Sequence, residues 1–279
     1  LGNQFVSDPK AITSARTANR CPNVLVIDDR VPHPSLGSGY PRAAHLLNAL
    51  SNLDLNITFY PLQFPVDDWP ETYRSLNKGI EVILQKGHLG LQSFLESRKG
   101  FFQYIIVSRV HNMSIFKELM EAEETLVGNA KIIYDAEALT ASREIMRKKL
   151  NQQLISEQEQ TDLFANEIEK AATADVVIAV SKKESETYRE HGIENIRVLG
   201  HTLQSSPGDK EFSAREGILF VGALRDEGSP NVDSILWFIV NVLPLIEKEI
   251  PDINLYIVGD KGAQSLASIE KTNVSFLGR

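Results

Sequence analysis

The sequence predicts an α/β protein of doubly wound parallel sheets, arranged in two units of unequal size. Short runs rich in Val, Ile and Leu alternate with helical patterns along the chain, as a parallel sheet covered on both faces requires. The alternation stops over residues 201–216 and restarts at Gly217, which indicates a linker between two units. The 279 residues are enough for two such units.

The first unit is predicted over residues 23–200, after a leader at 1–22. Its predicted strands are NVLVID (23–28), LNITFY (55–60), IEVIL (80–84), FQYIIV (102–107), AKIIY (130–134), DVVIAV (175–180) and IRVLG (196–200). Helical patterns separate these strands. Ser181 and Glu184 have the spacing of a helix-capping box. The charged segment 139–172 fits one long helix or two shorter ones.

The linker at 201–216 is rich in Ser, Pro, Gly and charge, without apolar periodicity. A partial second Rossmann-like unit is predicted over 217–279, with strands GILFVG (217–222), INLYIVG (253–259) and VSFLG (274–278). The apolar stretch 234–246 between the first two strands predicts a buried helix, with Trp237 and Phe238 in the core. That stretch is shorter than the roughly 20 residues that span a bilayer.

Composition excludes several classes of function. The net charge of -8 provides no global positive field for nucleic acid or an anionic membrane. We therefore expect no nucleic-acid partner. We also expect no transmembrane segment, because the apolar stretch 234–246 is too short, while a peripheral membrane contact stays open. Cys21 is the only cysteine, which excludes an internal disulfide framework and a thiolate metal cluster and suits a cytoplasmic protein. The six histidines lack H-E-x-x-H spacing, and no metal site is expected.

The run VLVIDDRVPHPSLGSGYPRAAHLLNAL, at 24–50, places two carboxylates and a glycine turn between a strand and a helix. Asp28 and Asp29 look like the acidic pair of a receiver domain, but serine and arginine follow the strand at 102–107 where that fold needs an aspartate. A dinucleotide fingerprint is also excluded, because Arg42 stands in place of its third glycine. No G-K-[ST] is present for a P-loop.

Five segments follow one another in an order that is typical of one enzyme family. They are the run at 24–50, IIVSRVHN (105–112), IIYDAEALTASRE (132–144), VIAVSKKESE (177–186), and ILFVGALRDEGSPNVDSILWFIVNVLPLI with INLYIVGDKG (218–262). Together they resemble a glycosyltransferase of family 4, which has the GT-B architecture of two Rossmann-like domains. The resemblance implies transfer of a sugar from a nucleotide-sugar co-substrate to a saccharide or lipid-linked acceptor in an interdomain cleft, without a tightly bound cofactor.

The resemblance also implies where substrates bind. In the first unit, the small side chains of Gly37, Ser38 and Gly39 would let a sugar or phosphate approach backbone amides. The other acceptor or cleft candidates are Asp29, Arg42, Ser108, Arg109, His111, Asp135 and Glu137. The donor-binding candidates are Gly222, Arg225, Asn231 and Gly259, with His201 at the junction of the two units. No catalytic residue is assigned from the sequence.

The chain departs from the family pattern in its second unit. Ala223 follows Gly222 where many members have arginine, and no lysine stands at the family's diphosphate position, so that Arg225 would have to substitute from a displaced place. The family's E-x7-E motif would lie beyond Arg279. We therefore expect a fragment that ends within the donor domain, folds, and does not transfer sugar on its own.

Several candidates have a structural alternative. Gly37 and Gly39 could be ordinary turn glycines, and the two carboxylates after the first strand could cap loops. Asp135 and Glu137 could bind a divalent ion or cap the following helix, and Arg109 could be a buried arginine paired with one of them. Two alternative functions also remain: a sugar-nucleotide epimerase of the same fold, and a non-catalytic carbohydrate-binding relic.

Overall fold

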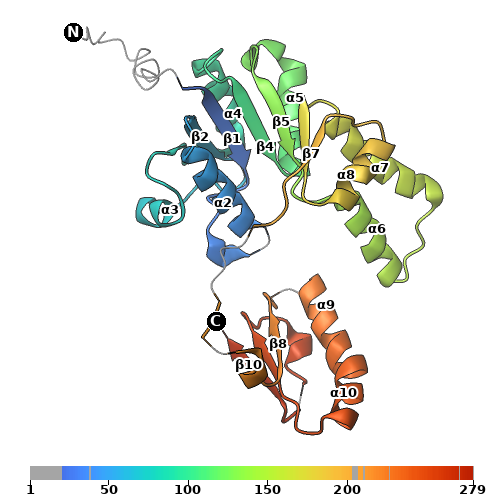
Figure 1. The fold of residues 1–279 in the computed structure, drawn as a ribbon. Helices are drawn as coiled ribbons and strands as arrows, with labels where there is room; N and C mark the ends of the chain where they lie inside the picture. Colours follow the sequence, from blue (N-terminus) through green and yellow to red (C-terminus); the bar gives the residue numbers. More distant parts are fainter. Residues whose placement is uncertain are drawn as a thin grey trace. The chain divides into compact units, whose positions relative to one another are not determined.

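The computed structural model of the protein describes residues 21–37, 39–202, 207–209, 211–225, 227–269 and 271–278. The chain divides into two compact units, Leu1–Leu203 and Gln204–Arg279 (Figure 1). Each unit has its own sheet and its own core, so each is described by itself.

The first unit contains a seven-stranded sheet and seven α-helices among its described residues. The strands are β1 (Asn23–Asp28), β2 (Asn56–Pro61), β3 (Glu81–Val82), β4 (Tyr104–Ser108), β5 (Lys131–Asp135), β6 (Val176–Ala179) and β7 (Ile196–Val198). The helices are α2 (Tyr40–Ser51), α3 (Trp69–Ser75), α4 (Gly87–Ser97), α5 (Val110–Ala122), α6 (Thr140–Leu150), α7 (Glu157–Ala171) and α8 (Lys182–Glu190), with short 3-10 turns η1 (Pro34–Leu36) and η2 (Glu124–Leu126). Each of the seven predicted strand segments contains a strand.

Two local predictions of helix structure can be compared with the model. The segment 139–172 forms two helices, α6 and α7, instead of one long helix. The predicted start of α8 is confirmed, because the Ser181 hydroxyl accepts a hydrogen bond from the backbone N–H of Glu184 at 3.2 Å. The Glu184 carboxylate accepts from the backbone N–H groups of Leu139 and Val180 instead of that of Ser181, so half of the predicted capping box is present.

The order of the strands identifies where a ligand site is expected. The sheet runs β3-β2-β1-β4-β5-β6-β7, and every neighbouring pair is parallel. The chain builds outward from β1 through β2 and β3, then returns to the other side of β1 with β4. The strand order therefore reverses between β1 and β4. In open α/β sheets, ligands bind at the carboxyl ends of the strands at this switch point.

Apolar side chains cover both faces of this sheet. In β1, Val24 and Val26 belong to one buried cluster, which includes Leu47 of α2. Leu25 and Ile27, on the opposite face, belong to a second cluster that includes side chains of α4, α5, α7 and α8. Burial on both faces explains why the strand sequences are continuous apolar runs without alternation. The polar residues that follow the strands are held by this rigid frame.

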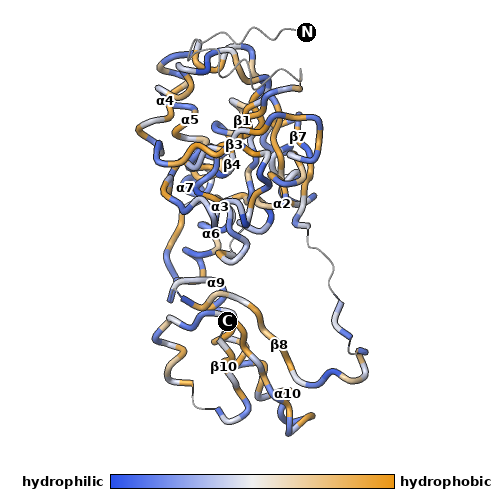
Figure 2. Tube along the Cα trace, turned by 90° about the vertical axis from the view of Figure 1, so that its left-hand side faces the viewer, coloured by the Kyte–Doolittle hydropathy of each residue, from blue (hydrophilic) through white to orange (hydrophobic). Residues whose placement is uncertain are grey.

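The second unit is a smaller parallel sheet with helical structure beside it. Its strands are β8 (Ile218–Val221), β9 (Leu255–Val258) and β10 (Val274–Gly278), in the order β10-β9-β8. The helical segments are α9 (Pro230–Trp237), a π-helical stretch η4 (Phe238–Val242) and α10 (Leu243–Glu249), with short 3-10 turns η3 (Phe212–Ala214) and η5 (Gln264–Leu266). The trace around β8 is mostly orange, that is hydrophobic, in Figure 2. All three predicted strands are present.

The predicted buried helix at 234–246 is buried on one side only. Ile235, Ile239 and Leu243 recur every four residues and belong to the core of the unit, as the inner stripe of an amphipathic helix does. Trp237 is 59% exposed, so its predicted place in the core is wrong, while Phe238 is partly buried against the core. The helical run covers a single sheet, which leaves its outer side in solvent. None of the helices in the described ranges has the length and apolarity to cross a membrane.

Candidate functional site

Charged side chains gather where β1, β4 and β5 end. Asp28 is the last residue of β1 and Asp29 follows it, Arg109 follows β4, and Asp135 ends β5. The strands are adjacent and parallel, with Ser108 of β4 opposite Asp135. The three strand ends therefore bring these residues together at the switch point of the sheet.

Arg109 is the centre of this cluster. Its Nε donates to Asp28 Oδ1 at 2.9 Å and lies 3.3 Å from Asp29 Oδ2, and its Nη1 donates to Glu137 Oε2 at 3.4 Å. The guanidinium lies 4.7 Å from the ring centre of Tyr40, at cation-π distance. The predicted alternative of a buried arginine paired with Glu137 matches these contacts, but Asp28 is its nearest carboxylate.

The backbone at this cluster adopts an unfavourable conformation. Arg109 and Glu137 have φ angles of 75° and 60°, in the left-handed region that residues with a side chain rarely adopt. Such residues cost roughly 1–3 kcal/mol each and persist where surrounding contacts hold them, often at functional sites. Here the two strained residues are joined to each other by an ion pair.

Asp29 holds a histidine in place. Its Oδ1 lies 2.5 Å from His111 Nε2 and accepts a hydrogen bond from Asn112 Nδ2 at 2.9 Å. Gln63 Nε2 donates in turn to Asn112 Oδ1 at 3.0 Å, which orients the amide. Although burial raises the pKa of Asp29, the hydrogen bonds from His111 and Asn112 and the charge of Arg109 keep it below the ordinary 3.8. The result is an ionised carboxylate bound to an imidazole that is 51% exposed.

The pKa of Asp28, next to Asp29, is shifted in the opposite direction. Burial raises the pKa of Asp28 from 3.8 to about 6, against the opposing attraction of Arg109. Its Oδ1 also accepts the backbone N–H of Asp29 at 2.7 Å. Neighbouring carboxylates whose environments separate their pKa values are a common feature of acid and base chemistry. Asp29 is therefore the carboxylate that is ionised throughout the neutral range.

Arg42 and Asp135 form a buried ion pair beside this cluster. Both terminal nitrogens of Arg42 donate to the two oxygens of Asp135 at 2.8 Å, and the side chains are 3% and 2% exposed. Arg42 also donates to the carbonyl of Leu199, just after β7, at 3.1 Å, and the Ser108 hydroxyl donates to Asp135 at 3.4 Å. These predicted cleft residues use their polar groups to connect α2, β4, β5 and the chain after β7.

The glycine loop before α2 has a close neighbour within the protein. Gly39, with φ 84°, precedes α2, and a Cβ atom there would lie 1.9 Å from Glu137 Oε1. Gly37 has φ 69° and open space around it, while Ser38 lies outside the described residues. The group that lies close to Gly39 is thus the Glu137 carboxylate, and the approach of a sugar or phosphate to this loop stays a prediction.

The donor-binding candidates of the second unit lie after β8, after β9 and at the start of α9. A Cβ atom at Gly259 would lie 1.9 Å from the Gly222 carbonyl oxygen, so the absent side chain lets two backbones approach each other. Asn231 donates to the Ala223 carbonyl at 3.1 Å, and Arg225 Nε donates to Asp260 at 3.0 Å. His201 belongs to the first unit and its imidazole is exposed. The predicted role of His201 in donor binding at the junction of the two units stays a prediction.

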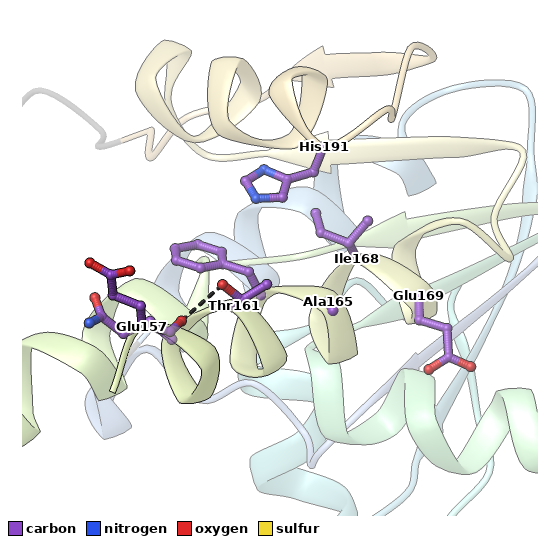
Figure 3. A pocket seen from close by; sticks show the side chains of 8 residues that line it. Glu157, Thr161, Ala165, Ile168, Glu169 and His191 are labelled. Carbon is purple, nitrogen blue, oxygen red and sulfur yellow. Dashed lines mark hydrogen bonds between the residues drawn. The ribbon is translucent and has the colours of Figure 1, made fainter. Parts of the chain in front are cut away.

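One of the hollows on the first unit borders the site. A groove of about 490 Å³ lies between α5, α6 and α7 and has His111 in its wall. A hollow of about 650 Å³ lies over α7, where the His191 ring stacks on Phe164 at 5.3 Å (Figure 3). No predicted site residue lines the second hollow, and we interpret it as the packing seam between α7 and the end of α8.

Sequence reasoning missed three members of the site. The ring of Tyr40 contacts Arg109, Asn112 donates to Asp29, and Gln63 donates to Asn112. None of the three was singled out as a candidate. Asn112 directly follows His111 at the start of α5, and this was a usable signal; nothing local marks Gln63, which lies after another strand. Within the described ranges, no group of three or more His, Cys, Asp or Glu side chains could hold a metal ion.

Two solved structures share the fold of this chain. Sucrose-phosphate synthase from Thermosynechococcus elongatus is similar with a TM-score of 0.57 and 15% identity, over 92% of this chain and 70% of that one. UGT2 of Phytolacca americana, complexed with UDP-2fluoro-glucose and pterostilbene, has a TM-score of 0.53 and 11% identity, over 93% and 71%. No family model and no curated protein matches the sequence. The predicted GT-B-like α/β fold is thereby confirmed.

Proposed function

We propose that this protein is a glycosyltransferase in which His111 accepts the proton of the acceptor hydroxyl. The observation that carries the proposal is the contact between His111 and Asp29 at the switch point of the sheet. A base oriented by an ionised carboxylate is a recurring arrangement for activating a hydroxyl. The fold shared with the two glycosyltransferases, one of them holding a sugar nucleotide, supports the choice of reaction.

Four groups at these strand ends have a role in the proposed reaction. His111 Nε2 is bound to Asp29, so the other ring nitrogen, Nδ1, is the atom that would take the proton. The acceptor oxygen then attacks the anomeric carbon of the donor sugar, and the nucleoside diphosphate leaves with the bonding electrons. Asp29 stabilises the resulting imidazolium by its negative charge. Asn112 and Arg109 hold Asp29 in position.

The second unit is proposed to bind the nucleotide-sugar co-substrate. Gly222 and Gly259 leave the ends of β8 and β9 without side chains, while their own N–H groups donate to the carbonyls of Val258 and Gly278 at 2.9 and 2.8 Å, so the group proposed to bind the diphosphate is Arg225. The ion pair between Arg225 and Asp260 is partly exposed, so Arg225 can exchange its partner for a diphosphate. No tightly bound cofactor is required in this scheme.

The test is a transfer assay with UDP-, GDP- and ADP-sugars and a mixture of saccharide acceptors, read by nucleoside diphosphate release and mass spectrometry of products. His111→Gln should lower kcat about 10²- to 10⁴-fold, as removal of a general base does. His191→Gln is the matched control, since His191 is an exposed histidine of the same unit and lies in the other hollow. It should leave kcat unchanged.

Two results would contradict the proposal in different ways. Full turnover by His111→Gln would show that the base lies elsewhere. Binding of sugars without release of nucleoside diphosphate from any donor would support the alternative of a non-catalytic carbohydrate-binding protein.

A further inference from the structure

The groove beside His111 has an apolar floor and a charged rim. Helices α5, α6 and α7 enclose it, and Ala141 and Leu163 contribute apolar surface. His111 stands at its α5 side, and Arg143 and Lys170 line it from α6 and α7. Its volume of about 490 Å³ lies within the usual range for small-molecule sites.

The carboxylates of this groove already have partners. Glu167 is 2% exposed and accepts hydrogen bonds from the backbone N–H groups of Thr140 and Ala141, at 3.0 and 2.7 Å, and from the Thr140 hydroxyl at 2.9 Å. Its charge is thus matched by the amino end of α6. Glu144 pairs with Arg147 at 2.8 Å. Neither carboxylate is left to neutralise another cation.

Two cations of the groove have no carboxylate partner among the described residues. Arg143 is exposed, and no hydrogen bond or ion pair involves its guanidinium. Lys170 donates to the side chain and carbonyl of Asn166, one turn earlier in α7. The chain as a whole carries a net charge of -8, so the two unmatched positive charges of this groove are opposite in sign to the net charge of the chain. It favours an anionic ligand.

We infer that this groove binds the acceptor, and that the acceptor is a sugar phosphate. A phosphate monoester carries about 1.5 to 2 negative charges at neutral pH, which matches one arginine and one lysine. Arg143 and Lys170 would bind the phosphate, and the apolar floor would lie under the sugar ring. One wall of the groove is His111, so a hydroxyl of the same molecule can face the proposed base. This inference rests on the proposed function.

The test measures binding without any donor, by isothermal titration with glucose 6-phosphate, glucose, glucuronate and inorganic phosphate. Glucose 6-phosphate should bind at least about tenfold more tightly than the other three, because it alone combines the dianion with the ring. Arg143→Gln combined with Lys170→Gln should weaken its binding roughly 10- to 100-fold. Lys149→Gln, which removes a cation of α6 outside the groove lining, should leave binding unchanged.

The outcomes separate this inference from the proposed function. Equal binding of glucose and glucose 6-phosphate, or unchanged binding in the double variant, overturns the groove assignment. Binding of inorganic phosphate as tight as that of glucose 6-phosphate also overturns it, because the ring would then contribute nothing. Transfer that depends on His111 but prefers neutral acceptors refutes the inference and retains the function. Tight glucose 6-phosphate binding that requires both cations, without any transfer, retains the inference and refutes the function.

Discussion

The two units of the chain use the ends of their strands differently. In the first unit, Arg42 and Asp135 are 3% and 2% exposed and pair through two hydrogen bonds. In the second, Arg225 and Asp260 pair at 48% and 33% exposure, and Gly259 directly precedes Asp260. A buried ion pair cannot lose one partner without leaving an uncompensated charge, whereas an exposed pair can exchange its partner for water. The strand-end charges of the first unit are therefore fixed by their partners, and those of the second unit remain available for other partners.

The sheet of the first unit is also more completely buried than that of the second. Both faces of β1 are buried, whereas in β8 the alternate residues Leu219 and Val221 are 65% and 69% exposed. Covering a sheet on both sides creates the dry surroundings in which the pKa values of Asp28 and Asp29 separate. The electrostatics of the first site are thus a consequence of its packing, and the comparison can be tested on the two units separately.

The largest expected effect concerns the two ion pairs. Arg42→Leu should lower the free energy of unfolding of the first unit by about 3–5 kcal/mol, because Asp135 would stay buried without its partner. The same change at the exposed pair, Arg225→Leu, should cost the second unit about 0–1 kcal/mol. Equal losses at the two sites would remove the contrast between the units.

The two tryptophans allow each unit to be followed alone. Trp69 lies in the first unit and Trp237 in the second, and the chain has no others. Urea unfolding in a Trp237→Phe background would report on the first unit by fluorescence, and unfolding in a Trp69→Phe background on the second. Arg42→Leu combined with Asp135→Leu is the rescue variant, and it should recover much of the stability lost in the single variant.

The second prediction is that Asp28 of the first unit and the pKa-shifted carboxylates of the second unit contribute to the pH dependence of stability with opposite signs. The pKa of Asp28 is about 6 in the folded protein against 3.8 ordinarily, so folding favours the protonated carboxyl. The resulting contribution to the free energy of unfolding is complete below about pH 4 and is lost as pH rises through 6. This difference is equivalent to about 3 kcal/mol. The free energy of unfolding of Asp28→Asn, relative to that of the wild type, should therefore rise by up to that amount between pH 4 and pH 7. The measurement is urea unfolding followed by Trp69 fluorescence. An advantage independent of pH would contradict the burial argument.

In the second unit, two carboxylates have pKa values that are lowered, in contrast to the raised pKa of Asp28. Hydrogen bonds from Ser265 lower the pKa of Glu227, and hydrogen bonds from Asn273 and Lys271 lower that of Glu247. Groups of this kind contribute stability above their unfolded pKa and lose it as pH falls. The second unit, followed with Trp237, should thus become less stable from pH 5 to pH 3. Glu247→Gln should reduce that dependence.

The sequence predicted the frame of the molecule better than its site. Apolar runs and their spacing located the ten strands that the described residues form, because burial on a sheet imposes a local pattern. The burial of Trp237 was predicted wrongly, because the sequence does not tell how many layers cover a helix. Glu137 was a candidate, but its contacts with Gly39 and Arg109 join three loops distant in sequence. Such contacts depend on strand order, which no local pattern encodes.

The smallest expected effect is at the exposed face of β8, and it tests whether the two sheets are covered as differently as the structure indicates. Leu25 in β1 is 0% exposed and Leu219 in β8 is 65% exposed. Leu219→Ala should change the free energy of unfolding of the second unit by no more than about 1 kcal/mol, the range of strand propensity on a solvent-facing surface. Leu25→Ala is the matched control and should cost the first unit about 2–5 kcal/mol, because it leaves a cavity in a packed core. A loss above about 2 kcal/mol for Leu219→Ala would mean that this face of β8 is packed against something in solution. The second unit would then resemble the first, and its open strand ends would need another explanation.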